Sequence, residues 1–295
     1  GVYTADPRVV STARKVTHTS YDEMLEMASL GAGVMHSRSI EFAKKFNVPV
    51  HVRSSQEDTT GTIISTVSED PTRGVSGAAV TMDEARITLS GVPDKPGTSN
   101  AIFSAIARAN ITVDMIVQDA GVGGISNISF TVPSAELAPT LEAVQPIAEQ
   151  LGIQNITSRD NVSKISVVGI GMAEQSGVSD RMFRALSDKS INIHMITTSQ
   201  IKISVLVDRD QALEAINAVH QTFELDATSS DAVPAESPQA TPAADPAAAA
   251  NKLQGMEELA ITDIALDSTH ECVSAELFFC TPSKRRRLSA QTAID

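Results

Sequence analysis

A six-residue loop contains the side chains best suited to bind a small charged molecule. The loop reads Asp94-Lys95-Pro96-Gly97-Thr98-Ser99 and leads directly into a predicted helix. The free backbone N–H groups at the start of that helix suit a carboxylate, and Gly97 lets a ligand approach the backbone. Asp94 can accept a hydrogen bond from an ammonium group. In the alternative interpretation, Pro-Gly is an ordinary turn that Asp94 caps, and Ser99 caps the helix.

Asp114 and Gln118 are the next candidate binding residues. Asp114 lies in an apolar run between Val113 and Met115, where burying a carboxylate without a partner is costly. It therefore contacts a ligand or the nearby loop, or the alternation of a strand points it to solvent. Gln118 ends the same run, and it either contacts the side chain of a ligand or is an ordinary loop residue.

These residues belong to a sequence pattern that occurs twice, and this repeat is the strongest signal in the chain. Apolar residues match apolar residues in every segment, so both copies are expected to bury the same faces. The matched pairs are 86–92 with 164–170, 101–106 with 181–186, 111–116 with 191–196, and 128–132 with 203–207.

Each copy is predicted to fold as strand, loop, helix, strand, strand, helix, because β-branched runs alternate with helical stripes. In the first copy, a helix at about 134–151, bent by its two prolines, and a strand at 153–158 complete a βαββαβ unit. The second copy has a helix at about 211–222 but no strand after it. Val48–Val52 is the available strand, which would insert the first copy within the domain of the second.

The segments that follow the repeat have a different composition. Residues 227–255 are rich in Ala, Pro, Ser, Thr and Asp, and they are predicted to form a disordered linker. Ile261–Leu266 resembles residues 75–80 and is interpreted as the start of a third copy. We predict no helix or later strands after it, so residues 256–295 are expected to be poorly ordered or loosely attached.

Composition excludes several function classes. The net charge of -13 argues against a general nucleic-acid binder. The basic run Lys284–Arg287 is isolated and is predicted to be a solvated tail, with a localisation or anion-binding patch as the alternative. Neither Cys272 and Cys280 nor the six histidines have the spacing of a metal site, so no metal is expected. Without a signal peptide or long apolar span, the chain is predicted to be cytoplasmic with no membrane contact.

Several motifs together resemble the C-terminal part of aspartate kinases. Gly1–Arg8 is similar to the segment that closes the nucleotide site, and Tyr21–Ala32 is similar to the end of the kinase domain. Val50–Ser55 resembles the bridge into the regulatory region. Val92–Gly97 and Ile193–Ser199 resemble the family's two ACT modules. The resemblance runs from Gly1 to about Leu225.

The resemblance implies an α/β (α+β) fold of tandem ferredoxin-like βαββαβ ACT modules, the first inserted within the second, with a remnant of an amino-acid-kinase domain. The expected divisions are 1–47 for the kinase remnant, 75–161 for ACT module 1, 48–74 with 162–226 for ACT module 2, 227–255 for the linker and 256–295 for the incomplete third segment.

The resemblance also implies where ligands bind. The residues expected to contact ATP are Tyr3, Thr4, Asp6, Pro7 and Arg8. The residues expected to bind the effector are Asp94, Lys95, Pro96, Gly97, Thr98, Ser99, Thr112, Val113, Asp114 and Gln118 in the first module, and Val178, Ser179, Asn192, Ile193, Ser199 and Gln200 in the second.

The family's phosphate-binding motif, a glycine-rich segment with a lysine, does not occur in the sequence, and neither do its catalytic residues. Gly33 and Ser37 stand where lysine and proline are expected. Because Gly1 is not an initiator methionine, the chain is interpreted as a fragment or a regulatory subunit that is inactive alone and binds no ATP or magnesium by itself.

By the same resemblance, the parent activity is ATP-dependent phosphorylation of L-aspartate, with magnesium. The implied effectors are lysine, threonine or both, bound where ACT modules of two chains meet in a homodimer, and a catalytic kinase chain is the further partner that the resemblance allows. The alternatives are a non-catalytic regulatory subunit and a free amino-acid sensor.

Overall fold

The computed structural model describes residues 1–31, 35–56, 59–70, 73–119 and 123–227, together with the backbone of three further strands at 260–267, 274–281 and 284–288. The chain divides into two units, Gly1–Ser230 and Asp231–Asp295. Within these described ranges, no helix is long and apolar enough to cross a membrane.

The N-terminal part of the first unit is a small sheet covered by two helices. The sheet has the order β1-β3-β2, in which β1 (His18–Ser20) runs parallel to β3 (Thr62–Ser65), and β2 (Val50–Val52) runs antiparallel to β3. Helix α1 (Tyr21–Ser29) begins at Ser20, whose side chain accepts from the Glu23 N–H while the Glu23 carboxylate accepts from the Ser20 N–H. Helix α2 (Ser37–Phe46) ends at Asn47, which has a left-handed backbone.

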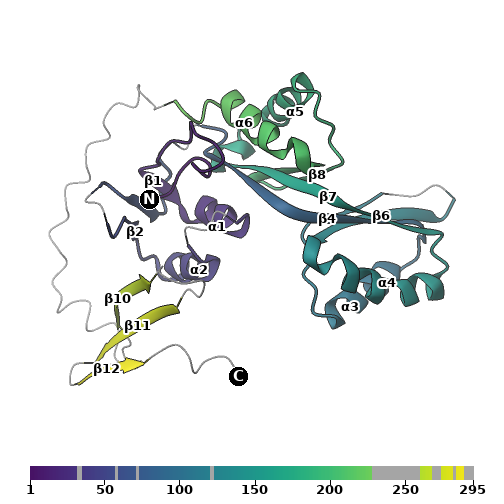
Figure 1. Cartoon of the computed structure of the whole chain (residues 1–295), viewed down its shortest axis with the longest axis horizontal. Helices are drawn as coiled ribbons and strands as arrows, with labels where there is room; N and C mark the ends of the chain where they lie inside the picture. The colour runs from purple at the N-terminus through teal and green to yellow at the C-terminus, as the bar shows by residue number, and fades with distance from the viewer. Residues whose placement is uncertain are drawn as a thin grey trace. The chain divides into compact units, whose positions relative to one another are not determined.

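A six-stranded antiparallel sheet forms the rest of the first unit, in the order β5-β6-β4-β7-β9-β8 (Figure 1). Helices α3 and α4 pack together at one end of this sheet, and α5 and α6 pack together at the other. The strands are β4 (Gly77–Pro93), β5 (Ile116–Gln118), β6 (Ile125–Pro133), β7 (Asn155–Val168), β8 (Met195–Thr198) and β9 (Lys202–Asp208). The helices are α3 (Thr98–Arg108), α4 (Leu137–Leu151), α5 (Val178–Asp188) and α6 (Ala212–Thr222), with 3-10 turns at Ser134–Glu136, Ile170–Ala173 and Arg209–Gln211.

Strands β4 and β7 each run through both modules. The first part of β4, Gly77–Thr81, pairs with Lys164–Val168 of β7, and the second part, Glu84–Ser90, pairs with Asn155–Val162. The strands predicted separately at 153–158 and 164–170 are therefore one strand. No glycine or proline interrupts β7, so its backbone continues in the extended conformation.

The prediction that Val48–Val52 completes the second module is wrong. Strand β2 pairs with β3, and its valines pack against the core formed by α1 and α2. The strand that completes the second module is Gly77–Thr81, and Ala78 lies in the core of that module. The nesting of the first module within the second holds, because the first module lies between this strand and the end of β7.

The strands predicted at 111–116 and 191–196 begin later than expected, at Ile116 and Met195. Each follows a residue with a left-handed backbone, Asn110 or Ser190. In the first module, the Thr131 hydroxyl accepts the Met115 N–H at 3.1 Å, so a side chain takes the place of a regular ladder bond. The irregular segment carries Asp114 out of the strand in which it was predicted.

Both modules have aliphatic cores. The first is centred on Ile87, Ile102 and Phe130, and the second on Ile165, Met182 and other aliphatic residues. Phe103 packs against Phe130 edge-to-face, with ring centroids 5.6 Å apart. These are the residues that the repeat predicted to be buried.

The second unit contains an antiparallel sheet of β10 (Ala260–Asp267), β11 (Ser274–Thr281) and β12 (Lys284–Leu288). The prediction that no strands follow Ile261–Leu266 is wrong. The basic run Lys284–Arg287 lies in β12 and pairs with β11, in place of the predicted solvated tail. Within the described residues, this succession of three strands differs from the strand-loop-helix order of the repeat. The predicted linker beyond Ala227, the expected Lys position at Gly33 and the residue Cys272 lie outside the described residues.

Candidate functional site

The loop at residues 94–99 is exposed and leads into an uncapped helix. Gly97 has φ +94° and is the residue before α3, and no side chain caps the helix there. The Asp94 N–H donates to the Gly124 carbonyl at 2.9 Å, which fixes the start of the loop to the segment preceding β6. Lys95 and Pro96 are exposed, whereas Thr98 is buried. The Thr98 N–H donates to the Lys95 carbonyl at 3.2 Å, so the Ser99 and Asn100 N–H groups are the ones at the start of α3 that remain for an anionic group.

Ser99 brings this loop together with the end of β5. Its hydroxyl donates to the Gln118 side-chain oxygen at 3.0 Å. Ser99 therefore contacts Gln118 instead of capping the helix, which excludes the alternative role for this side chain. Two residues 19 positions apart, both singled out from the sequence, lie at one site. Thr112 is exposed and Val113 packs against the core of the same module.

The loop requires a left-handed backbone at Gly97, and substitution of this glycine tests that requirement. Replacing Gly97 with alanine is expected to lower the free energy of unfolding by about 1–2 kcal/mol, because an L side chain disfavours φ +94°. The space around a Cβ is open, so no clash contributes. Urea unfolding measures the change, and Gly177→Ala, at φ +90°, is expected to show the same loss. A gain in stability, as at a glycine with negative φ, would contradict the argument.

The second module repeats part of this geometry. Gly177 precedes α5 with φ +90° and no side-chain cap, and Val178 is buried as Thr98 is. Asn192 and Ile193 line a shallow hollow of about 380 Å³ beside α5. Ser199 lies in the turn between β8 and β9, where its N–H donates to the Lys202 carbonyl at 2.7 Å.

Among the described residues of the second candidate site, the start of α5 and the end of β8 are not connected by the kind of hydrogen bond that connects the start of α3 and the end of β5 in the first. In the part of the chain that the structure describes, no hydrogen bond links Ser179 to Gln200 as Ser99 is linked to Gln118.

Asp114 has a partner that the sequence did not reveal. Its carboxylate forms an ion pair with Lys164 of β7, and Lys164 also contacts Glu84 of β4 at 3.3 Å. The Lys164 and Glu84 side chains are each 6% exposed, whereas that of Asp114 is 42% exposed. Burial raises the pKa of Glu84, although the Lys164 charge opposes the rise. One Glu84 oxygen is buried without a hydrogen bond to any described residue.

A second charged cluster also joins the modules, and here the basic residue belongs to the first module and its partner to the second. Arg86 of β4 donates to the His194 carbonyl at 3.2 Å, and the His194 ring lies 2.9 Å from Asp208 of β9. Arg159 of β7 contacts both the His194 ring and Asp208. Arg86 and Lys164 occupy matching positions of the repeat, so each module's basic residue contacts the other module. In the sequence, the match between Arg86 and Lys164 in the repeat was the one feature that could have indicated this contact between the modules.

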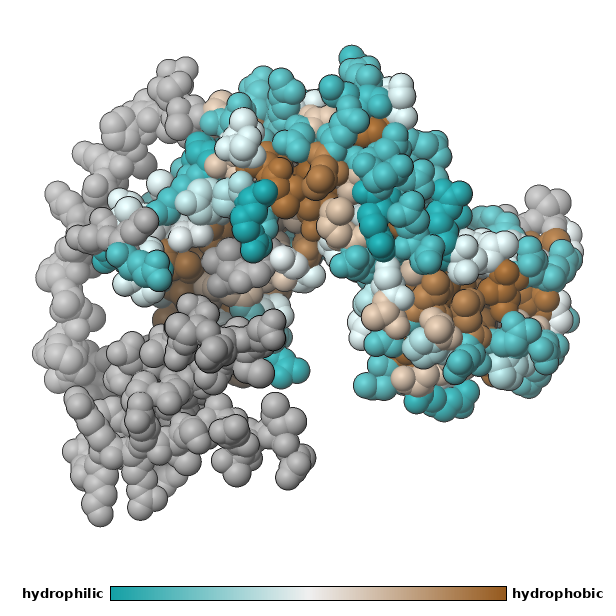
Figure 2. Space-filling model, viewed as in Figure 1, coloured by the Kyte–Doolittle hydropathy of each residue, from teal (hydrophilic) through white to brown (hydrophobic). Residues whose placement is uncertain are grey.

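The N-terminal segment lines a cavity of about 490 Å³. Tyr3, Asp6, Pro7 and Arg8 line it together with Ile216 and other apolar residues. Apolar surface is exposed over the start of β4 in Figure 2. Arg8 pairs with Asp6 at 2.7 Å. The fifth residue predicted to contact ATP, Thr4, is buried and bonded to other elements.

The comparisons with known proteins agree with this architecture. The ACT domain family matches residues 87–146 and 165–223, and the amino acid kinase family matches residues 1–54. The fold and these two matches therefore define a protein with paired ACT regulatory modules attached to the end of a kinase domain.

The aspartokinase of Pseudomonas aeruginosa is 43% identical over 230 residues, which are 77% of this chain and 56% of that protein. The chain belongs to the aspartokinase family. It spans about half the length of the curated relatives that it matches.

Solved structures share the fold. The aspartate kinase of Synechocystis is 31% identical, with a TM-score of 0.54, covering 90% of this chain and 44% of that chain. The structure of E. coli aspartokinase III in complex with lysine and aspartate is 25% identical, with a TM-score of 0.61, covering 76% of this chain and 49% of that chain. These similarities support the paired ACT fold that the strand pairing shows.

Proposed function

We propose that this chain is the regulatory part of an aspartate kinase, and that its ACT modules bind lysine, threonine or both to control phosphorylation of L-aspartate by ATP. The observation that carries the proposal is the convergence of the loop at 94–99 and the end of β5 through the Ser99–Gln118 hydrogen bond. The uncapped helix start, the exposed Asp94 carboxylate and the Gln118 amide support the proposal that this is a binding site.

The chemistry of the first site suits an amino acid. Backbone N–H groups at the start of α3 bind the α-carboxylate, and the Asp94 carboxylate accepts from the ammonium group. Gln118 contacts the ligand's side chain. Asp114 contributes negative charge nearby, with Lys164 as its internal partner. Thr112 and Val113 form the wall between these groups, and Lys95, Pro96, Gly97 and Thr98 shape the loop.

The second module contributes a corresponding surface, and we propose that two copies of the chain complete the pocket. Its residues are Val178, Ser179, Asn192, Ile193, Ser199 and Gln200. Asn192 offers both a donor and an acceptor. Support comes from the E. coli relative, which was solved with lysine in a form described as the T-state. Effector binding then favours an inactive arrangement of the kinase by differential affinity for two states.

The N-terminal segment provides part of a surface that could bind a nucleotide. A cavity of about 490 Å³ lies within the usual range for small-molecule sites, and Tyr3, Asp6 and Arg8 provide its polar groups. ATP would place phosphates near Arg8 if Asp6 released it. Among the described residues, no group of three His, Cys, Asp or Glu side chains can hold a metal ion. Magnesium would therefore depend on phosphates and on groups outside this set.

The second candidate is a regulatory subunit without kinase activity of its own, and it is supported by the match of the amino acid kinase family to residues 1–54. Mixing it with a kinase-only aspartokinase chain tests this role. Co-elution, and a change in the kinase's response to lysine or threonine, are expected. A kinase that neither co-elutes nor changes its response would exclude the subunit role.

Effector binding is tested by thermal unfolding with millimolar lysine, threonine, both, or methionine as the control. A ligand at one hundred times its Kd is expected to stabilise the chain by about 2.7 kcal/mol. For a unit of this size, the melting temperature then rises by roughly 5–10 °C. Ser99→Ala is expected to reduce the shift. A folded sample that shows no shift with either amino acid would count against binding by this chain.

A further inference from the structure

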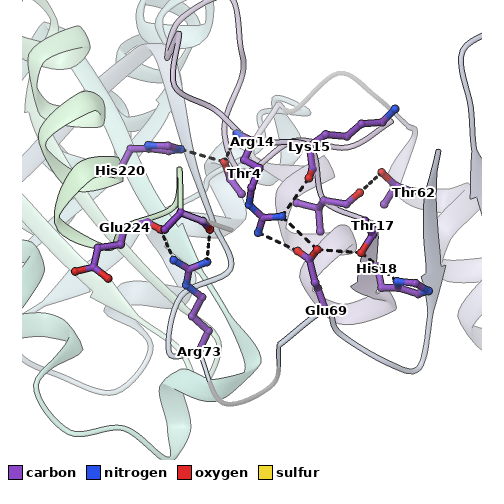
Figure 3. Close-up of polar contacts among 12 residues, drawn as sticks. Thr4, Arg14, Lys15, Thr17, His18, Thr62, Glu69, Arg73, His220 and Glu224 are labelled. Atoms are coloured by element: carbon purple, nitrogen blue, oxygen red, sulfur yellow. Dashed lines mark hydrogen bonds and ion pairs between the residues drawn. The ribbon is translucent and has the colours of Figure 1, made fainter. Parts of the chain in front are cut away.

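The first residues of the chain form a hairpin that closes on itself. The Thr4 N–H donates to the Arg14 carbonyl at 2.8 Å, and the Val16 N–H donates to the Val2 carbonyl at 2.9 Å. Arg14 in turn forms a two-bond ion pair with Glu69, which also accepts from the Thr17 hydroxyl at 2.9 Å (Figure 3). The hairpin is therefore anchored at its base, near the start of β1.

The second ACT module contacts this hairpin through Thr4. The Thr4 hydroxyl lies 3.0 Å from the His220 Nε2 of α6, and it accepts the Arg14 N–H at 3.0 Å. The Thr4 carbonyl accepts the N–H of Ala78 in β4 at 2.7 Å. Thr4 and His220 are each 1% exposed. Figure 3 shows the His220 ring pointing from α6 toward Thr4.

The surroundings of His220 keep its ring neutral. Burial lowers the pKa of His220, the Asp226 carboxylate opposes this effect, and the Arg73 cation adds to it. Thr12, on the same hairpin, lies 3.5 Å from the ring Nδ1. A neutral ring can accept a hydrogen bond from the Thr4 hydroxyl at Nε2. This completes a chain of hydrogen bonds from the Arg14 N–H through Thr4 to α6.

We propose that His220 is a positioning residue, through which the second ACT module holds the segment Tyr3–Arg8 in place. The inference rests on the proposed function, because it assigns to this contact the transfer of the effector state to the segment that faces the nucleotide. Helix α6 is suited to the role. It packs against α5, which begins at the candidate effector loop, and its Ile216 lines the same cavity as Tyr3.

Hydrogen–deuterium exchange on the full chain tests the contact directly. In His220→Leu, amides of residues 2–16 are expected to exchange about fivefold faster. This is the change in the opening equilibrium that the loss of one ordinary hydrogen bond produces. His220→Gln keeps a polar group at the Nε2 position and is expected to exchange like the wild type. Val219→Ala is the matched control, because Val219 is buried on the same helix and has no polar side-chain contact.

The results separate positioning from simple loss of stability. Unchanged exchange in His220→Leu would overturn the proposal. So would an equal acceleration in Val219→Ala, since the effect would then follow the stability of the module rather than the contact.

A second arm adds lysine or threonine at saturating concentration. The exchange of residues 2–16 is expected to change at least twofold in the wild type and to stay constant in His220→Leu. If an amino acid raises the melting temperature but leaves this exchange unchanged in the wild type, the transfer through His220 is overturned while effector binding stands. If the melting temperature does not respond, the proposed function fails, and the comparison of variants still decides whether His220 holds the hairpin.

Discussion

Replacing Lys164 with methionine is expected to lower the free energy of unfolding by about 3–5 kcal/mol at pH 7. Lys164 lies between Glu84 and Asp114 with 6% of its side chain exposed. Removing its charge leaves the Glu84 carboxylate buried without compensation, whereas Asp114 is exposed enough for water to replace its partner. Urea unfolding followed by circular dichroism measures the loss.

The pH dependence of this variant identifies Glu84 as the source. Burial already raises the pKa of Glu84 in the wild type, and loss of Lys164 removes an effect that lowers it. The folded variant therefore binds a proton that the unfolded chain releases, so its stability falls as pH rises above the ordinary value of 4.5. The deficit is expected to be smaller at pH 5 than at pH 8.

Two further variants serve as controls for Lys164. Lys44→Met removes an exposed ion pair with Asp22 and is expected to cost about 0–1 kcal/mol. Combining Lys164→Met with Glu84→Gln removes the stranded carboxylate and is expected to recover part of the loss. A cost for Lys164→Met no larger than that of Lys44→Met would show that the junction between the modules does not depend on this pair.

Phe130→Ala is expected to cost about 3–5 kcal/mol. Phe130 is fully buried in β6, at the centre of the first module's core. Its edge-to-face contact with Phe103 adds to the loss. The chain has only eight phenylalanines and no tryptophan, so the neighbouring aliphatic side chains must close the cavity alone.

Thermal and urea unfolding measure this effect. The matched control is Phe42→Ala, since Phe42 is 61% exposed on α2 and its removal is expected to change stability by about 0.5 kcal/mol or less. Because β4 and β7 pass through both modules, Phe130→Ala is also expected to lower the melting temperature of the second module. A second module that melts at its wild-type temperature would show that the shared strands do not couple the two.

The sequence predicted the elements that depend on local pattern. Helices at Thr98–Arg108 and Val178–Asp188 follow from apolar stripes at helical spacing, and the buried residues Ile102 and Met182 follow from the repeat. Gly97 was also selected, because a Pro-Gly turn stands directly ahead of the helical stripe, whereas Gly177 before α5 was identified only in the structure. Ser99 and Gln118 were both selected as site residues, although their contact was not predicted.

Strand partners could not be predicted in the same way. Val48–Val52 and Gly77–Thr81 are both short extended segments, and alternation does not state which sheet a strand joins. The second unit shows the same limit, since alternation did not reveal that β11 pairs with both β10 and β12.

By itself, then, the sequence determined that this protein has two repeated modules with aliphatic cores and a Pro-Gly loop before one helix of the first. Its resemblance to a family implied the ACT type and the nesting, and the structure supplied the strand, Gly77–Thr81, that produces the nesting. The tertiary structure alone decided which charges meet and where the regulatory module holds the N-terminal segment. Lys164 meets Asp114 across 50 positions, and Thr4 meets His220 across 216. Local pattern reflects the period of a helix or strand, whereas such contacts depend on how long strands pair and how helices pack on them.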